Sequence, residues 1–176
     1  LRKKIIQDLN FYNINTVNET LHFDCCEEDL NRLYKISSKN HCDAIIAAGG
    51  GKVLDSGKIL AHRLSIPCIT IPLSASTCAG WTALGNIYSK QGQFIKDINL
   101  SSCPDILVFD YSFIKTAPTH TLTSGIADSL AKWYESSITS SSNRDGLVQQ
   151  AIQISRVLRD QLFINSEEAL ADYSVE

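Results

Sequence analysis

The sequence predicts an α/β fold in which a parallel sheet is followed by an all-helical region. Apolar runs at residues 44–48 and 66–71 flank an amphipathic stretch at 53–64. Strand, helix and strand at this spacing are typical of a βαβ unit in a parallel sheet. Beyond Pro118 the apolar residues recur with helical periodicity, and no strand pattern is visible.

The length and composition fit one domain, or one and a part, of an ordinary globular protein. The chain has 176 residues, of which 44% are hydrophobic and 20% charged. We place the domain boundary at the change of pattern, so that residues 1–118 carry the sheet and residues 119–176 are helical. The chain contains no Met, begins at Leu1 and ends at Glu176 in a helix-like stretch. We therefore expect an internal segment of a longer protein.

Charge and cysteine content narrow the expected partners and location. The net charge is −3 without a basic block, which gives no electrostatic support for binding to nucleic acid or to an anionic membrane. The apolar runs are far shorter than the roughly 18 residues that a membrane-spanning helix needs. The six cysteines include no Cys-x-x-Cys pair, which favours reduced thiols in a cytoplasmic protein.

The elements before the βαβ unit have weaker patterns. Residues 1–9 are expected to form a short amphipathic helix, and residues 16–23 alternate in the manner of a strand. A helix at 27–39 follows, and Asp24 or Cys25 is placed to cap its N-terminus. The apolar positions of that helix are Leu30, Leu33, Tyr34 and Ile36.

A hairpin and one more strand are expected between the βαβ unit and the boundary. Residues 84–88 and 93–98 flank a short polar segment with a glycine, which predicts a β-hairpin. A further buried strand is expected at 106–109. Asp110 is placed to cap the helical turn at 111–115.

The turn between the first strand and the helix of the βαβ unit is the main candidate for a ligand site. It consists of Gly49, Gly50, Gly51 and Lys52. Glycines let the backbone approach a ligand closely, and a helix N-terminus offers N–H groups and a positive dipole end to a phosphate. Lys52 adds a positive charge, and Asp55 is placed to cap the helix or to bind a ligand hydroxyl. A structural turn without a ligand would have the same pattern, so the residues alone leave both interpretations open.

A stretch of small residues at 72–80 follows the second strand. It should lie beside the glycine turn at the carboxyl edge of the sheet, where ligands bind in open α/β folds. The hydroxyls of Ser74, Ser76 and Thr77 are candidate donors to a phosphate or sugar, although a solvated loop would also fit. Cys78 is either a reactive thiol or a small filler.

The first helix after the boundary carries a second candidate residue, Asp128. This residue lies off an apolar stripe that comprises Ile126, Leu130, Trp133 and Tyr134. Asp128 would either form an i,i+4 ion pair with Lys132 or act as a carboxylate ligand for a metal or substrate. The histidines have no metal-ligand spacing and are expected at the surface or in caps; they are His22, His41, His62 and His120.

Four segments are informative as an ordered set. They are Gly49-Gly-Gly-Lys-x-x-Asp55, the small-residue loop continuing to Ile87-Tyr88, Pro104-Asp-Ile-Leu-Val-Phe-Asp110, and Gly125-Ile-Ala-Asp128-Ser-Leu-Ala-Lys-Trp-Tyr-Glu135. The set resembles the glycerol dehydrogenase branch of the iron-containing, or group III, alcohol dehydrogenases over nearly the whole chain. The resemblance implies a Rossmann-like coenzyme domain followed by an all-helical domain, a dehydroquinate synthase-like fold.

The resemblance further implies an NAD- or NADP-dependent, metal-assisted dehydrogenase of a small alcohol. The glycine turn would hold the coenzyme pyrophosphate, and further coenzyme contacts would come from Asp55, Leu73, Ser76, Thr82, Leu84 and Tyr88. Asp128 would be one of three ligands of a divalent zinc or iron ion, and the other two, both histidines, would lie beyond Glu176. The acidic residue that selects the adenosine ribose would precede Leu1. Relatives commonly assemble, so a homo-oligomer is expected.

Two departures from the family pattern bear on substrate and coenzyme. Cys78 stands where glycerol dehydrogenases carry an aspartate that contacts the polyol, and a neutral thiol removes repulsion against an anionic substrate. Together with residues 132–135 and 166–172, this is similar to the hydroxycarboxylate dehydrogenase type, so a 2-oxo acid becomes a candidate substrate beside a polyol such as glycerol. Leu73 stands where relatives often have threonine, so only a backbone contact to the coenzyme would survive there. The alternatives are a non-catalytic dinucleotide-binding relative and, disfavoured by residues 77–81, a lyase of the dehydroquinate synthase type.

Overall fold

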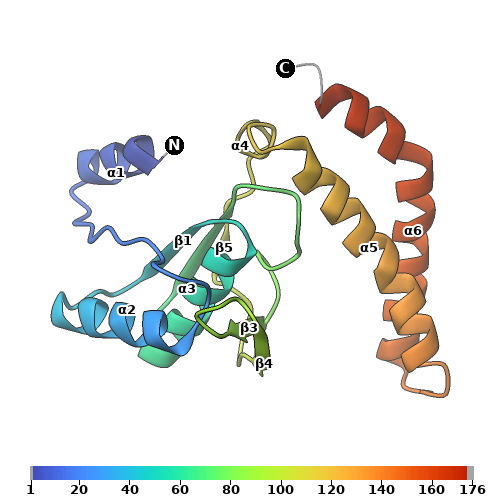
Figure 1. Ribbon diagram of the computed structural model, residues 1–176, viewed down its shortest axis with the longest axis horizontal. Coiled ribbons are helices and arrows are strands. Elements are labelled where there is room, and N and C mark those ends of the chain that lie inside the picture. Colours follow the sequence, from blue (N-terminus) through green and yellow to red (C-terminus); the bar gives the residue numbers. More distant parts are fainter. Residues whose placement is uncertain (1, 174–176) are drawn as a thin grey trace. The chain divides into compact units, whose positions relative to one another are not determined.

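The computed structural model describes residues 2–173 (Figure 1). The chain forms two compact units. The first comprises Leu1–Leu73 and Cys78–Phe113, and the second comprises Ser74–Thr77 and Ile114–Glu176. The short segment Ser74–Thr77 therefore belongs with the helices, although both of its neighbours in sequence belong with the sheet.

A three-stranded parallel sheet lies at the centre of the first unit and confirms the predicted α/β fold. Its strands are β1 (Ile45–Gly49), β2 (Cys68–Pro72) and β5 (Ile106–Leu107), in the order β1-β2-β5. The pairing of β1 with β2 runs from Ile45 opposite Cys68 to Gly49 opposite Pro72, so the two strands end together. Helix α3 (Gly51–Leu64) connects them, as the βαβ pattern predicts (Figure 1).

Helix α3 joins the sheet to the hairpin through its buried face. Leu54 and Ile59 are buried on this helix. At Gly57 a Cβ atom would lie 2.3 Å from the Cβ of Ala47 on β1, so only glycine permits this close approach. On the other side of the helix, Ile59 shares an apolar cluster with Ile87.

The hairpin is confirmed, whereas the last strand differs from its prediction. Strands β3 (Leu84–Tyr88) and β4 (Phe94–Asn99) pair antiparallel. The predicted buried strand at 106–109 is wrong in length and burial, because β5 comprises only Ile106 and Leu107 and both are exposed. Within the described residues β5 lies at the edge of the sheet. An apolar run alone does not distinguish a buried strand from an edge strand.

Helix α4 (Tyr111–Ile114) follows β5, and Asp110 caps it as predicted. The backbone N–H and the hydroxyl of Ser112 donate to Oδ1 of Asp110 at 2.8 and 2.7 Å. These hydrogen bonds lower the pKa of Asp110 below its usual value.

The two helices at the start of the chain are confirmed as α1 (Arg2–Phe11) and α2 (Glu27–Lys39). The predicted cap of α2 is wrong. Its N-cap is Cys26, which makes no side-chain capping bond. Asp24 instead pairs with Lys52 at 2.5 Å, and Cys25 is buried in the core, so neither side chain is available to the helix end.

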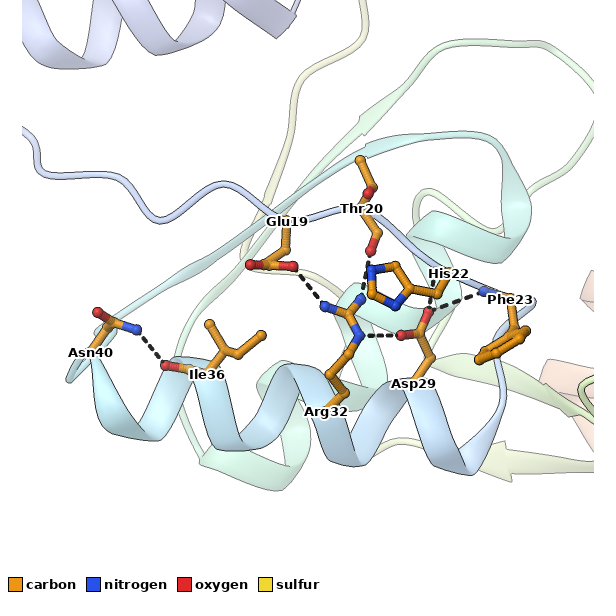
Figure 2. A network of polar contacts seen from close by, with 8 residues as sticks. All are labelled: Glu19, Thr20, His22, Phe23, Asp29, Arg32, Ile36 and Asn40. Atoms are coloured by element: carbon orange, nitrogen blue, oxygen red, sulfur yellow. Dashed lines mark hydrogen bonds and ion pairs between the residues drawn. The ribbon is translucent and has the colours of Figure 1, made fainter.

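The predicted strand at residues 16–23 is also wrong. This segment has no regular secondary structure and bends at His22 and Phe23, and it pairs with no strand in the part of the chain that the structure describes. Side chains of α2 hold it instead, as Figure 2 shows. Arg32 donates to a Glu19 carboxylate oxygen and to the Thr20 carbonyl, both at 2.6 Å. Asp29 lies 2.6 Å from Arg32 and accepts the N–H of His22 at 2.7 Å.

Replacing Asp29 by asparagine is expected to lower the free energy of unfolding at neutral pH by about 2 kcal/mol, the scale of a charge-assisted hydrogen bond. Burial of Asp29 alone would raise its pKa, but hydrogen bonds from Arg32 and from the N–H groups of His22 and Phe23 outweigh burial and lower it. Because the folded pKa lies below the unfolded one, the stabilisation is complete above about pH 4 and disappears as the pH falls through the folded pKa.

Denaturant unfolding of the wild type and Asp29→Asn across this pH range measures the effect. Asp97→Asn on β4 is the matched control, because Asp97 is exposed. A stability difference that stayed constant down to acidic pH would contradict the charge-assisted role of Asp29.

The second unit is built around helices α5 (Thr119–Thr139) and α6 (Gly146–Tyr173). The guanidinium of Arg159 on α6 lies 4.0 Å from the ring centroid of Trp133 on α5. The hydroxyls of Ser136 and Ser155 lie 3.1 Å apart between the same two helices. The region after Pro118 is therefore helical, as the sequence predicts. None of the helices in residues 2–173 combines the length and the hydropathy of a membrane span.

All six cysteines are free thiols, as the sequence predicts. Burial raises the pKa of Cys25 and of Cys68 to about 11 in each case. Both thiols therefore stay protonated at neutral pH and act as small apolar side chains.

Candidate functional site

The glycine turn lies at the carboxyl end of β1 and forms the N-terminus of α3. Gly50 is the N-cap, and Gly51 is the first helical residue. The Gly50 carbonyl accepts hydrogen bonds from the N–H groups of Val53 at 3.0 Å and Leu54 at 3.1 Å. The N–H groups of Gly51 and Lys52 precede this ladder and have no acceptor within the helix. Such groups at the positive end of a helix suit a phosphate.

Leu73 lies beside the glycine turn. Its backbone N–H donates to the carbonyl of Gly49 at 3.0 Å, which joins the chain at the carboxyl ends of β1 and β2. Ligands bind at this edge in open α/β sheets. The contact uses the backbone of Leu73 and does not depend on its side chain.

Lys52 and Tyr88, both predicted coenzyme-binding residues, are close in space. The Lys52 ammonium lies 5.7 Å from the ring centroid of Tyr88 and 2.5 Å from Asp24. The sequence does not identify Asp24 as part of this site, because its pairing with Lys52 depends on the packing of α2 beside α3. An anion at the helix N-terminus would compete with Asp24 for the ammonium.

Asp55 is directed into the protein and is not the helix cap that the sequence allowed. One carboxylate oxygen lies 3.0 Å from Nζ of Lys58, and the other accepts the N–H of Asn86 at 3.2 Å. Lys58 is absent from the predicted site residues. The i,i+3 spacing of an acid and a base on one helix indicates that Asp55 and Lys58 can form an ion pair. The sequence has no pattern that indicates the burial of this pair.

Thr82 and Leu84 lie together because both bind the buried ammonium of Lys58. The ammonium donates to the carbonyl of Thr82 at 3.1 Å, to the Thr82 hydroxyl at 3.2 Å and to the Leu84 carbonyl. Cys78, half-buried, begins the turn before them, where its carbonyl accepts the N–H of Trp81 at 3.2 Å.

The second unit holds the two remaining candidates, Ser76 and Asp128. The hydroxyl of Ser76 lies 3.0 Å from that of Ser74. The loop packs directly on α5, since a Cβ atom at Gly125 would lie 1.7 Å from the carbonyl oxygen of Ala75. Gly125 stands three residues before Asp128, so the loop touches α5 one helical turn from that carboxylate.

Asp128 forms the predicted i,i+4 pair with Lys132 at 3.0 Å. The hydrogen bond with Asp128 raises the pKa of Lys132, although burial acts in the opposite direction. The Asp128 side chain remains 41% exposed, so an oxygen donor suited to a divalent metal is accessible. Among residues 2–173 no group of three or more His, Cys, Asp or Glu side chains is placed to hold a metal. The role of Asp128 as a metal ligand stays a prediction.

Comparisons with known proteins agree on one family. The family model described as iron-containing alcohol dehydrogenase matches residues 1–111. The chain is 47% identical over 148 residues to an uncharacterised oxidoreductase of Synechocystis sp., which covers 84% of this chain and 38% of that protein. It is 34% identical over 150 residues to hydroxycarboxylate dehydrogenase A of Escherichia coli, with coverage of 84% and 41%.

A solved structure gives the same result. The crystal structure of glycerol dehydrogenase from Schizosaccharomyces pombe superposes with a TM-score of 0.85 at 28% identity. The superposition covers 97% of this chain and 44% of that chain. This chain thus spans less than half the length of each of these three proteins.

Proposed function

This chain belongs to the iron-containing alcohol dehydrogenase family, and from this premise we propose that the protein is a metal-dependent, NAD- or NADP-dependent oxidoreductase. It interconverts a small alcohol and its carbonyl compound by hydride transfer. The observation that carries the proposal is the glycine turn, where the first N–H groups of α3 stand without helical acceptors at the carboxyl edge of the sheet. The names of the characterised relatives favour a dehydrogenase over a lyase or a non-catalytic binding protein.

The candidate residues other than Asp55, whose carboxylate is buried against Lys58, have binding roles in this proposal. Gly49, Gly50, Gly51 and Lys52 hold the coenzyme pyrophosphate. Further contacts to the coenzyme would come from Leu73, Ser76, Thr82, Leu84 and Tyr88. The exposed flank of Asp128 gives one carboxylate oxygen to a zinc or iron ion, with Lys132 balancing part of its charge.

The chemistry divides between the bound groups and the chain. When bound, the divalent metal supplies Lewis acidity that polarises the substrate oxygen, and the nicotinamide exchanges the hydride. The chain itself would position these groups and exclude water from the reacting atoms.

The residue at position 78 bears on the substrate. A thiol in place of a carboxylate removes repulsion against an anionic substrate, so Cys78 supports a 2-hydroxy acid and its 2-oxo acid over glycerol. A relative named hydroxycarboxylate dehydrogenase A agrees with this choice, and a structural neighbour named glycerol dehydrogenase keeps a polyol as the second candidate.

The remaining parts of the proposal concern organisation. The proposed domains are a coenzyme domain at 1–118 and the start of a metal and substrate domain at 119–176. The compact units have other bounds, because Ser74–Thr77 and residues 114–118 belong with the helices. The protein is a cytoplasmic homo-oligomer without nucleic-acid or membrane partners. The free cysteines support the cytoplasmic location, and the net charge of −3 gives no support for nucleic-acid or anionic-membrane partners. The homo-oligomer rests on the resemblance to the family alone.

Fluorescence titration of the full-length protein with NADH and NADPH tests the function. Saturable binding of one coenzyme is expected and would identify it. A turnover screen of glycerol against 2-oxo acids, with and without a chelator, then identifies substrate and metal dependence. If neither coenzyme bound at millimolar concentration, the glycine turn would be a structural turn only and the dehydrogenase proposal would have to be abandoned.

A further inference from the structure

A fully buried ion pair lies on the same helix that forms the glycine turn. The side chains of Asp55 and Lys58 on α3 are 8% and 1% exposed, and their charged atoms are 3.0 Å apart. Lysine is almost never fully buried unless it is paired. Burial removes both charges from water, so the pair persists only because further hydrogen bonds satisfy the remaining donors and acceptors.

Those further hydrogen bonds converge on one short segment of the chain. Lys58 donates to both oxygens of Thr82 and to the carbonyl of Leu84. Asp55 accepts the backbone N–H of Asn86. Within the part of the chain that the structure describes, these side-chain hydrogen bonds of the pair beyond α3 all reach residues 82–86.

We propose that Asp55 and Lys58 are positioning residues that fix residues 82–86, with the proposed coenzyme contacts Thr82 and Leu84, against the helix that carries the glycine turn. The inference rests on the proposed coenzyme-binding function. The sequence predicts that Asp55 contacts the coenzyme directly, and the proposed positioning role replaces that contact. The pair acts on the coenzyme through Thr82 and Leu84 and does not touch it.

The contact pattern supports positioning over general stabilisation. An apolar pair of similar volume would fill the same space, and such replacements of buried ion pairs are often neutral for stability. An apolar pair cannot bind the carbonyls of Thr82 and Leu84, so it would leave the segment without its attachment to α3. Stability and coenzyme affinity should therefore separate.

The test uses the full-length protein and two variants. Lys58→Met leaves the Asp55 carboxylate buried without its counter-ion, and we expect it to lower both the melting temperature and NADH affinity. The double variant Asp55→Leu, Lys58→Met removes both charges. It is expected to regain most of the melting temperature but to keep a loss of about tenfold in affinity, the effect of one displaced hydrogen-bonded contact. Lys35→Met on α2, where the lysine is exposed, is the control and should change neither quantity.

The outcomes separate the inference from the function on which it rests. A folded double variant that binds NADH as tightly as the wild type would reject positioning and leave the proposed function intact. A wild type that binds neither NADH nor NADPH would reject the function and the inference together. If the double variant does not fold, Lys58→Met serves instead at a temperature where it is folded, because it too lacks the ammonium that binds the carbonyls of Thr82 and Leu84. Unchanged affinity in folded Lys58→Met would equally reject the inference, and a weakened affinity would support it.

Discussion

Gly125→Ala is expected to destabilise the helical unit strongly, although alanine is the better helix former. In the interior of α5 the substitution would ordinarily contribute up to about 1 kcal/mol of stability. Here the new Cβ would lie 1.7 Å from the carbonyl oxygen of Ala75 and 3.3 Å from Cα of Ser76. The obstructing atoms are backbone, which cannot move aside as a flexible side chain can. The loop must shift, so we expect a net loss of about 3 kcal/mol or more, at the upper end of overpacking effects.

Thermal unfolding followed by circular dichroism measures this loss as a fall of roughly 5 °C or more in the melting temperature. Gly146→Ala is the matched control, because Gly146 begins α6 and a Cβ atom there would meet no neighbouring atom within 4 Å. Equal melting temperatures for the two variants would show that the loop does not rest on α5. If Gly125→Ala bound the coenzyme more weakly at a temperature where it is folded, the shift of the loop would also have displaced Ser76 from its proposed contact with the coenzyme.

Asp128→Asn in the full-length protein is expected to remove bound metal and most turnover while coenzyme affinity stays the same. The neutral amide keeps the shape of the side chain but loses the charge that a divalent cation needs. Lewis-acid stabilisation of a transition state is worth several kcal/mol, so kcat should fall by roughly a hundredfold or more. Coenzyme affinity should not change, because the glycine turn does not depend on Asp128.

Metal content by elemental analysis, NADH titration and steady-state turnover check the three parts of this prediction. Glu135→Gln is the matched control, since Glu135 lies on the same helix and also pairs with Lys132, at 3.4 Å. Both variants lose an ion pair with Lys132, but only Asp128→Asn removes the proposed metal ligand. If Asp128→Asn retained full turnover, Asp128 would be a surface ion-pair residue and not a ligand.

Local sequence patterns predict the elements that are formed by interactions between residues near one another in the chain. The apolar run, the glycines and the amphipathic stretch of the βαβ unit identify β1 and α3 to within two residues. The cap by Asp110 and the hairpin of β3 and β4 are predicted equally well, because their hydrogen bonds join residues that are near in sequence.

Features that depend on distant partners could not be predicted. Residues 16–23 alternate in the manner of a strand, but a strand also needs a neighbouring strand to pair with. In this structure the side chains of Arg32 and Asp29 form the hydrogen bonds to the segment instead. The role of Asp55 could not be predicted for the same reason. Its spacing to Lys58 is visible, whereas the enclosure of both by residues 82–86 requires the packed hairpin.

The membership of Ser74–Thr77 in the helical unit limits how this protein can be divided or recombined. The chain passes between the two units after Leu73, after Thr77 and after Phe113, so no single cut in the gene separates them. A polypeptide that began at Ile114 would lack Ala75 and Ser76, against which Gly125 packs. If the helical unit were exchanged between related proteins, Ser74–Thr77 would therefore have to be exchanged together with it.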